Sequence, residues 1–452
     1  MMMTSQSIHP YLDMPDGFDV PGLPTLLDAE AMRERFNHLL PNGVPSFESC
    51  RISNLRQKTR TTSTICYEMV RSSNGGASKQ LAYARAFARE EYGDALRRVG
   101  LSRWASTDEG LSITPLHDLS AIAYWFPNDE RLDGLRRVVV PKKLQRLLYA
   151  HCSEYPAASW RVSDRSIRLQ IIRYKPERRA VIRCRFRAQE IDGSERHERF
   201  VYLGLYERER LEGLAVNIAR IRELAKDAQH WTTASLIGID EDDALVIWDE
   251  LRGKPLRDLL STNDWEPAID SCARAIAEMH EADGSTLPSR ESIESQLADV
   301  SAYLLNTLPE CHELITGIAR RLAQSETLSK SEHRSIVHGD LHPGQLIIDG
   351  AQVGIIDFDR ARCGNPMEDL GNLRAQLWLG PPGERGYESD VVFDRFLAAY
   401  THARAIDTPP GALEEWTAFS VFRSAAVPLG RFEPNWRQRA RNILHESKSL
   451  LS

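Results

Sequence analysis

The sequence lacks the patterns that mark several large protein classes. Its seven cysteines are scattered and never form C-x-x-C, which argues against a disulfide framework or a zinc module. No apolar run approaches the roughly 18 residues that a transmembrane helix needs, and residues 1–18 are too polar for a signal core. The net charge of −7 at pH 7 argues against a dedicated nucleic-acid binder, which usually has a basic domain. We therefore expect a cytoplasmic protein that binds neither nucleic acid nor a membrane.

What is present is an ordinary globular composition, with 42% hydrophobic and 27% charged residues. At about 150 residues per domain, the chain is long enough for about three domains. Residues 1–25 carry four prolines among small polar residues and predict a loose arm. We expect an N-terminal extension over residues 1–150, a small sheet-rich lobe over 151–252 and a helical lobe over 253–452.

The N-terminal extension has both helical and strand-like patterns. Apolar residues recur at helical spacing over 26–40, and 88–99 is also helical. Two strand-like stretches, 61–70 and 80–87, flank a polar turn that contains Gly-Gly and predict a hairpin.

A second group of strand patterns is stronger. Residues 168–175, 180–187 and 199–206 predict three antiparallel strands, which are followed by a helix over 208–228 and a strand over 244–248. This order of elements predicts a small α+β lobe.

The two strand groups resemble each other. Arg56-Gln57-Lys58 precedes the first hairpin as Arg173-Tyr174-Lys175 precedes the second, and Tyr83 matches Tyr202, at spacings of 117 to 119 residues. A duplicated sheet module and a chance likeness between two hairpins both explain these few identities.

Helical spacing dominates beyond residue 253. It predicts helices over 265–282, 292–308, 313–325, 390–403, 412–427 and 435–450. One β-rich island, residues 335–360, interrupts this pattern.

The island brings together oxygen ligands. Its two short apolar strands are joined by an Asp-Gly turn, which is a strong hairpin signal. The antiparallel return places Gln345, just before the first strand, near Asp357, just after the second, and Asp340 lies in the loop that leads in. Carboxylate and amide oxygens suit Mg²⁺, which keeps several waters and is shared with substrate phosphates.

The spacing within the island matches a known pattern. The run His338-Gly339-Asp340 precedes Gln345 by the interval that separates Asp from Asn in the protein-kinase loop H-R-D-x-x-x-x-N, and Asp357-Phe358-Asp359 stands where D-F-G does. This pattern resembles the aminoglycoside phosphotransferase and choline kinase family, distant relatives of the protein kinases. Segments 251–256, 273–280 and 364–371 resemble the same family, and the likeness covers about residues 165–445.

The resemblance implies an α+β, bilobal protein-kinase-like fold, with a small antiparallel-sheet lobe, a mainly helical C-lobe and an additional N-terminal α/β segment. It implies an enzyme that moves the γ-phosphate of ATP or GTP to a hydroxyl of a small molecule with Mg²⁺ as cofactor. The roles that it implies fall on Asp340 as catalytic base, Gln345 and Asp357 as metal ligands, Asp359 as a possible metal neighbour, and His338, Gly339 and Asp369 as residues that shape the loop.

The sequence departs from the family at two places. Gln345 stands where most members have Asn, although its carbonyl oxygen is chemically equivalent. Kinases also carry a lysine on the third strand of the small lobe, and that position falls here on Gly204 or Leu205.

Basic residues earlier in the small lobe offer a substitute for that lysine. Ten Lys and Arg lie between residues 161 and 187 with only two acidic residues, and Lys175, Arg178 and Arg179 are the candidates for phosphate binding. A solvated strand face that pairs with acids elsewhere explains the same charges. Neither G-x-G-x-x-G nor a Walker loop occurs, which argues against a P-loop kinase.

Two other functions remain open. The missing lysine favours a non-catalytic pseudokinase that binds a nucleotide or a partner. The N-terminal extension would suit a kinase-like enzyme that docks a peptide and phosphorylates its Ser or Thr. For a small acceptor, we expect a pocket near the loop 380–383 and Trp378, Trp416 and Trp436. The identity of the acceptor, the preferred nucleotide and the number of subunits stay open.

Overall fold

A computed structural model describes residues 19–57, 59–73, 76–100, 104, 111–289, 291–329, 334–380, 386–405 and 409–452. The chain forms two compact units. Unit 1 comprises Met1–Glu209, Ile237–Ile247 and Val427–Ala440, and unit 2 comprises Arg210–Leu236, Trp248–Ala426 and Arg441–Ser452. Most of the predicted arm and most of the predicted acceptor loop lie outside the described residues.

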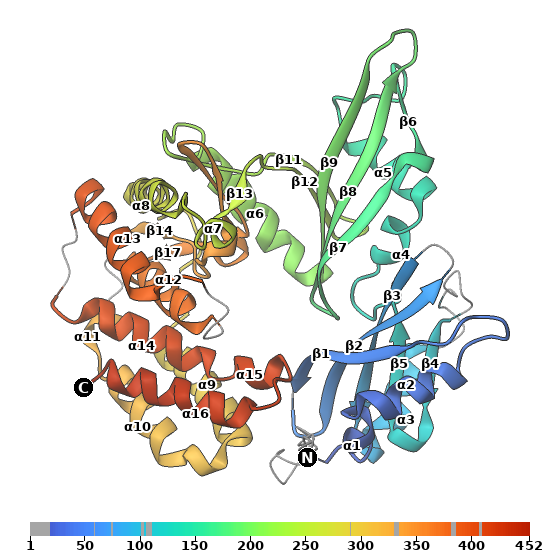
Figure 1. The fold of residues 1–452 in the computed structure, drawn as a ribbon, viewed down its shortest axis with the longest axis horizontal. Helices are drawn as coiled ribbons and strands as arrows, with labels where there is room; N and C mark the ends of the chain where they lie inside the picture. Colours follow the sequence, from blue (N-terminus) through green and yellow to red (C-terminus); the bar gives the residue numbers. More distant parts are fainter. Residues whose placement is uncertain are drawn as a thin grey trace, which may run out of the picture. The chain divides into compact units, whose positions relative to one another are not determined.

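The first part of unit 1 is a five-stranded antiparallel sheet in the order β1-β2-β3-β5-β4 (Figure 1). Its elements are α1 (Leu23–Leu26), α2 (Ala29–His38), β1 (Ser49–Gln57), β2 (Thr62–Ser73), β3 (Gly76–Phe87), α3 (Arg89–Val99), β4 (Ile113–Leu116) and β5 (Ala121–Trp125). The helix predicted over 26–40 is split, because the Asp28 side chain accepts hydrogen bonds from the N–H groups of Glu30 and Ala31 and starts a new helix there.

A second sheet follows in the order β11-β12-β9-β8-β6, with β7 also paired to β8. The elements of this region are α4 (Leu135–Val138), α5 (Pro141–His151), β6 (Trp160–Val162), β7 (Arg168–Lys175), β8 (Arg179–Glu190), β9 (Arg196–Tyr206), α6 (Arg208–Leu224), β11 (Leu236–Asp240) and β12 (Leu245–Asp249). The predicted strands are confirmed.

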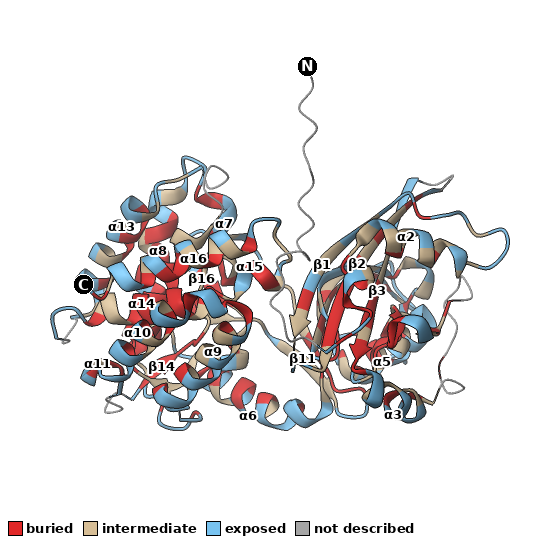
Figure 2. Cartoon of the chain, turned by 90° about the horizontal axis from the view of Figure 1, so that it is seen from below, coloured by how far each residue is buried: buried red, intermediate tan, exposed pale blue. Residues whose placement is uncertain are grey.

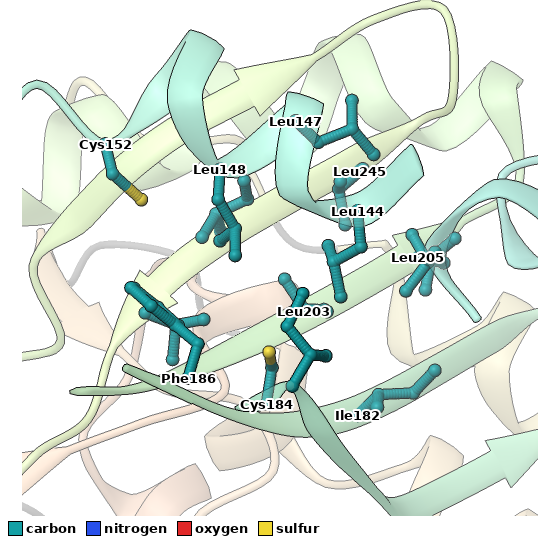
Figure 3. Close-up of a cluster of buried hydrophobic side chains, with 14 of the residues drawn as sticks. Leu144, Leu147, Leu148, Cys152, Ile182, Cys184, Phe186, Leu203, Leu205 and Leu245 are labelled. Atoms are coloured by element: carbon teal, nitrogen blue, oxygen red, sulfur yellow. The ribbon is translucent and has the colours of Figure 1, made fainter. Parts of the chain in front are cut away.

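One face of this sheet is closed by α5. Figure 3 shows Leu144, Leu147 and Leu148 of the helix over Ile182 and Leu203 of the sheet. These leucines recur at helical spacing, whereas the buried residues of β8 alternate with partly buried or exposed ones. The opposite face of β8 therefore presents its arginines.

The two sheets share a topology. In the first, α3 lies between β3 and β4; in the second, strands run in the order β7-β8-β9-β12-β11 and α6 lies between β9 and β11. Ser120 (φ 48°) and Ala244 (φ 47°) adopt the same left-handed conformation just before β5 and β12. Their carbonyl oxygens accept from the N–H of Phe87 at 3.0 Å and of Tyr206 at 3.1 Å, respectively.

Most of unit 2 is helical. Its helices include α7 (Leu256–Leu259), α8 (Trp265–Glu281), α9 (Ile293–Thr307), α10 (His312–Ala323), α11 (Glu326–Ser329), α12 (Met367–Leu379), α13 (Ser389–Ala403) and α14 (Ala412–Ser424). The last helices, α15 (Val427–Gly430) and α16 (Trp436–Ser449), include residues of unit 1. All six predicted helical segments beyond residue 253 are confirmed.

The β-rich island belongs to unit 2. It contains β14 (Ser335–Val337), β15 (Leu346–Asp349), β16 (Gln352–Ile355) and β17 (Arg362–Gly364), and β10 (Trp231–Thr233) and β13 (Lys254–Pro255) complete the sheet β10-β16-β15-β13. The predicted α+β class, with antiparallel sheets and a mainly helical part, is confirmed. None of the helices in the described ranges is long and apolar enough to cross a membrane.

Each unit has buried residues of its own. In Figure 2 they lie on β2 and β3 in unit 1 and on α8 and α14 in unit 2. Trp416 and Trp436 are among the largest fully buried side chains. These two tryptophans are therefore core residues and do not line the acceptor pocket that we expected near them, whereas Trp378 is partly buried.

Candidate functional site

The hairpin of β15 and β16 brings two predicted metal ligands together. Cross-strand pairing runs from Leu346 opposite Ile355 to the turn, where Gly350 has φ 64°. At the open end, the amide nitrogen of Gln345 lies 3.5 Å from Oδ2 of Asp357. Asp357 has φ 71°, an uncommon conformation for a residue other than glycine. Asp359 lies two residues further on and is partly buried.

The side-chain oxygen of Gln345 is buried and accepts no hydrogen bond from the described residues. Gln345 is 3% exposed, and its Oε1 has no hydrogen-bond partner among the described residues. A buried carbonyl oxygen without a partner is costly, and it is a hard ligand of the type that Mg²⁺ prefers. No group of three or more His, Cys, Asp and Glu in the described part of the chain could hold a metal. A magnesium ion here would therefore need the amide oxygen of Gln345 beside Asp357, together with water and phosphate oxygens.

The loop that carries Asp340 is tied to this hairpin by His338. The Nε2 atom of His338 lies 2.9 Å from the carbonyl oxygen of Ile356, and the N–H of Asp340 donates to His338 Nδ1 at 3.4 Å. This pair of contacts is satisfied by a neutral imidazole with its proton on Nε2. Gly339 has φ 79°, and a Cβ there would collide with the guanidinium of Arg362. Glycine is therefore required immediately before Asp340.

Asp369 of α12 holds the backbone of the same loop. Its carboxylate accepts from the N–H groups of His338 at 2.6 Å and Gly339 at 2.9 Å, and lies 3.2 Å from Nε2 of His280. Burial alone would raise the pKa of Asp369, but the hydrogen bonds from His280 and His338 outweigh it and hold the pKa below its ordinary value. Asp369 thus acts on the loop as an ionised, fully buried acceptor.

Sequence reasoning missed the partners that extend this network. His280 is fully buried, its Nδ1 lies 2.8 Å from the hydroxyl of Tyr400, and burial lowers its pKa. Asn372, one helical turn after Asp369, donates to the carbonyl oxygen of Leu341 at 2.9 Å. The spacing of Asp369 and Asn372 on one helix was the signal that could have revealed the second contact.

One arginine from a distant helix, Arg423 of α14, lies within electrostatic reach of Asp340, which the sequence also did not reveal. Burial lowers the pKa of Arg423 on α14, and the charges of Arg360, Glu368, Arg362 and Asp340 act on it as well. Arg362 pairs with Glu368. Because Arg423 is more than 80 residues from Asp340 in sequence, no local pattern connects the two.

The predicted phosphate-binding residues belong to unit 1. Lys175 and Arg179 face each other across the turn from β7 to β8, and the N–H of Arg178 donates to the carbonyl oxygen of Lys175 at 3.1 Å. Arg179 lies over the ring of Tyr206 at 5.6 Å. A Cβ at Gly204 would meet that ring at 3.0 Å, so Tyr206 covers one of the two positions, Gly204 or Leu205, at which the resemblance would place the kinase lysine.

The tip of this turn is held by the N-terminal sheet. Glu177 is 5% exposed with φ 62°, and its carboxylate lies 2.5 Å from Arg56 of β1 and 3.3 Å from Arg85 of β3. Its N–H donates to Asp129 at 2.9 Å, and the hydroxyl of Tyr174 donates to the same oxygen at 2.8 Å. We call these five residues the turn clamp. The clamp fixes the β7–β8 turn to the N-terminal extension.

Comparison with known proteins identifies a family for part of the chain. The family described as "Phosphotransferase enzyme family" matches residues 205–416, which include the Asp340 loop, the hairpin and Asp369. None of the curated proteins compared matches the chain.

Several solved structures are similar to this chain. A choline kinase from Cryptosporidium parvum Iowa II is 12% identical with a TM-score of 0.47, over 68% of this chain and 94% of that chain. A putative aminoglycoside phosphotransferase from Ralstonia eutropha JMP134 is 15% identical with a TM-score of 0.45, over 68% and 97%. A GDP complex of aminoglycoside 2'-phosphotransferase-IIIa is 14% identical with a TM-score of 0.45, over 68% and 98%.

The resemblance predicted from the Asp340, Gln345 and Asp357 spacing is therefore confirmed for the part of the chain that carries these residues. Residues 205–416 match the phosphotransferase enzyme family, and this match supports a phosphotransferase.

Proposed function

We propose that the protein transfers the γ-phosphate of ATP or GTP to a hydroxyl of a small molecule, with Mg²⁺ held at Gln345 and Asp357. The observation that carries the proposal is the buried, unpartnered oxygen of Gln345 beside Asp357. Such an arrangement is costly in a purely structural hairpin and is stabilised by a cation.

Asp340 is the proposed catalytic base, which accepts the proton of the acceptor hydroxyl. Phosphoryl transfer depends mainly on positioning and on charge neutralisation. His338 and Asp369 supply the positioning, because they hold the backbone on both sides of Gly339. Bound Mg²⁺ would neutralise charge on the transferred phosphate.

We also propose a domain organisation of three parts. Residues 151–252 form the nucleotide lobe and residues 253–452 the catalytic lobe. The shared strand order and the matching left-handed residues Ser120 and Ala244 support residues 1–150 as an extension that contains a duplicated copy of the nucleotide-lobe sheet.

Calorimetric titration of ATP and GTP, with and without Mg²⁺, tests the proposal on the wild type and on Asp357→Asn. We expect Mg²⁺-dependent binding in the wild type and its loss in the variant. Turnover with an acceptor should fall by roughly 10²-fold or more in Asp340→Asn, as for removal of a general base, while nucleotide binding persists. Asp390→Asn, at an exposed carboxylate of α13, is the control.

A pseudokinase is the second candidate, because β9 has no lysine at Gly204 or Leu205, where the resemblance would place it, and Tyr206 packs over Gly204. It predicts nucleotide binding without turnover, or binding that Asp357→Asn leaves unchanged. Unaltered turnover in Asp340→Asn would exclude Asp340 as the base.

A further inference from the structure

A cavity of about 680 Å³ lies on the second sheet of unit 1. It is lined by six arginines that come from β6, β7, β8, β9 and the short turn before β7: Arg161, Arg165, Arg168, Arg185, Arg187 and Arg196. Glu198 is the one carboxylate among the lining residues. Positive charge is thus concentrated in a chain whose net charge is −7.

The strand register brings like charges together in this cavity. Arg168 of β7 lies opposite Arg185 of β8, a pairing that is destabilising on its own. The next outward residue of β8, Arg187, lies opposite Glu198 of β9. Neighbouring positions of three strands therefore hold three arginines for one glutamate.

Few of these arginines are neutralised by the protein. Glu198 lies 3.3 Å from Arg187 and 3.8 Å from Arg185, and Arg168 donates at 2.8 Å to the carbonyl oxygens of Arg165 and Ile167.

The other three arginines of the cavity have no acidic partner among the described residues. Among the described residues, no carboxylate lies within ion-pair distance of Arg161, Arg165 or Arg196, and all three are exposed. The interpretation of this face as one that pairs with acids elsewhere therefore does not account for them.

We propose that this cavity binds a small molecule that carries two or more phosphate groups. Arginine presents a planar fork of donors that fits phosphate oxygens in pairs, and the convergence of six of them favours more than one phosphate. The volume falls within the range of small-molecule sites. This site is separate from the proposed phosphoryl transfer, since it includes none of the residues around Asp340.

The lining favours a small anion over a nucleic-acid strand. Single-stranded nucleic acids are bound by aromatic side chains on which the bases stack, and no Phe, Tyr or Trp is among the lining residues. The six arginines also line one cavity on strands β6 to β9. The cavity therefore offers groups that recognise phosphate but none that stack on a base.

The test is calorimetric titration of inorganic tripolyphosphate into the full chain without Mg²⁺. Binding should weaken by roughly tenfold or more in the double variant Arg161→Ala/Arg196→Ala, since each substitution removes charge-assisted hydrogen bonds to phosphate oxygens. The control is Arg97→Ala/Arg98→Ala, which removes the same charge from an exposed part of α3 and should leave binding unchanged. Arg165→Gln is a milder second variant in case the double variant unfolds.

The outcomes separate this site from the proposed nucleotide site. Retained tripolyphosphate binding in Asp357→Asn supports two independent sites, whatever the fate of nucleotide binding. Equal weakening in the control variant would show unspecific attraction, and absence of binding at millimolar tripolyphosphate would overturn the proposal. Much tighter binding of single-stranded RNA, with the same loss in the double variant, would replace it with a nucleic-acid site.

Discussion

At the residue scale, the buried carboxylate of Asp369 is the central support of the Asp340 loop. In Asp369→Asn, an amide NH₂ replaces one acceptor oxygen, so at least one N–H donor from His338, Gly339 or His280 loses its partner. An unsatisfied buried donor costs about 1–3 kcal/mol, and we expect a loss of unfolding free energy of that size. Urea unfolding measures it, with the exposed Asp390→Asn as matched control. Equal stability of the two variants would show that the loop does not depend on this carboxylate.

The candidate site residues that could be predicted from the sequence are those that lie close together along the chain. Gln345 and Asp357 flank a hairpin whose turn signal and spacing are local, and Asp340 lies in the loop that leads into it. The approach of Gln345 to Asp357 at 3.5 Å could therefore be expected. His280 reaches the same network from α8, and Arg423 of α14 lies within electrostatic reach of Asp340. Their positions depend on helix packing, which leaves no local signal in the sequence.

At the scale of elements, Glu177 of the turn clamp joins the β7–β8 turn to the N-terminal sheet. Its ion pair with Arg56 is mostly buried, with side chains 7% and 24% exposed. A double-mutant cycle of Glu177→Ala and Arg56→Ala should therefore give a coupling energy of about 1–3 kcal/mol in urea unfolding. If the β7–β8 turn contacts nucleotide phosphates, Glu177→Ala should also raise the KM for nucleotide more than it lowers kcat.

If the effects of Glu177→Ala and Arg56→Ala on the unfolding free energy simply add, the clamp is contradicted. Glu177→Gln is the isosteric control, because it removes the charge and keeps the side-chain volume.

The local sequence pattern predicted the strands on both sides of this turn but not β1, whose partly buried residues follow no strict alternation. Arg56, Arg85 and Asp129 come from distant parts of the extension, so the clamp appears only once the sheet has formed.

At the scale of the whole molecule, the two units contain buried networks with opposite pH dependence. In unit 2, burial lowers the pKa of His280, and the pKa of Asp369 is also held low. Both groups therefore stabilise the fold above their unfolded pKa values and lose that contribution as pH falls. In unit 1, burial raises the pKa of Asp129 from 3.8 to about 6 despite its hydrogen bonds to Glu177, Arg131 and Tyr174.

The sign for Asp129 follows from proton linkage. Between pH 3.8 and about 6 the folded state binds the proton more tightly than the unfolded state, so this contribution, about 3 kcal/mol at most, is present below pH 4 and lost as pH rises through 6. We expect Asp129→Asn, which cannot titrate, to lose less unfolding free energy than the wild type between pH 4 and pH 7. Urea unfolding, monitored for unit 1 by hydrogen exchange of the β3 and β5 amides, measures the difference in unfolding free energy between the two proteins. Parallel pH profiles for the two proteins would mean that Asp129 is ionised throughout this range, and that the clamp is held by charge pairing alone.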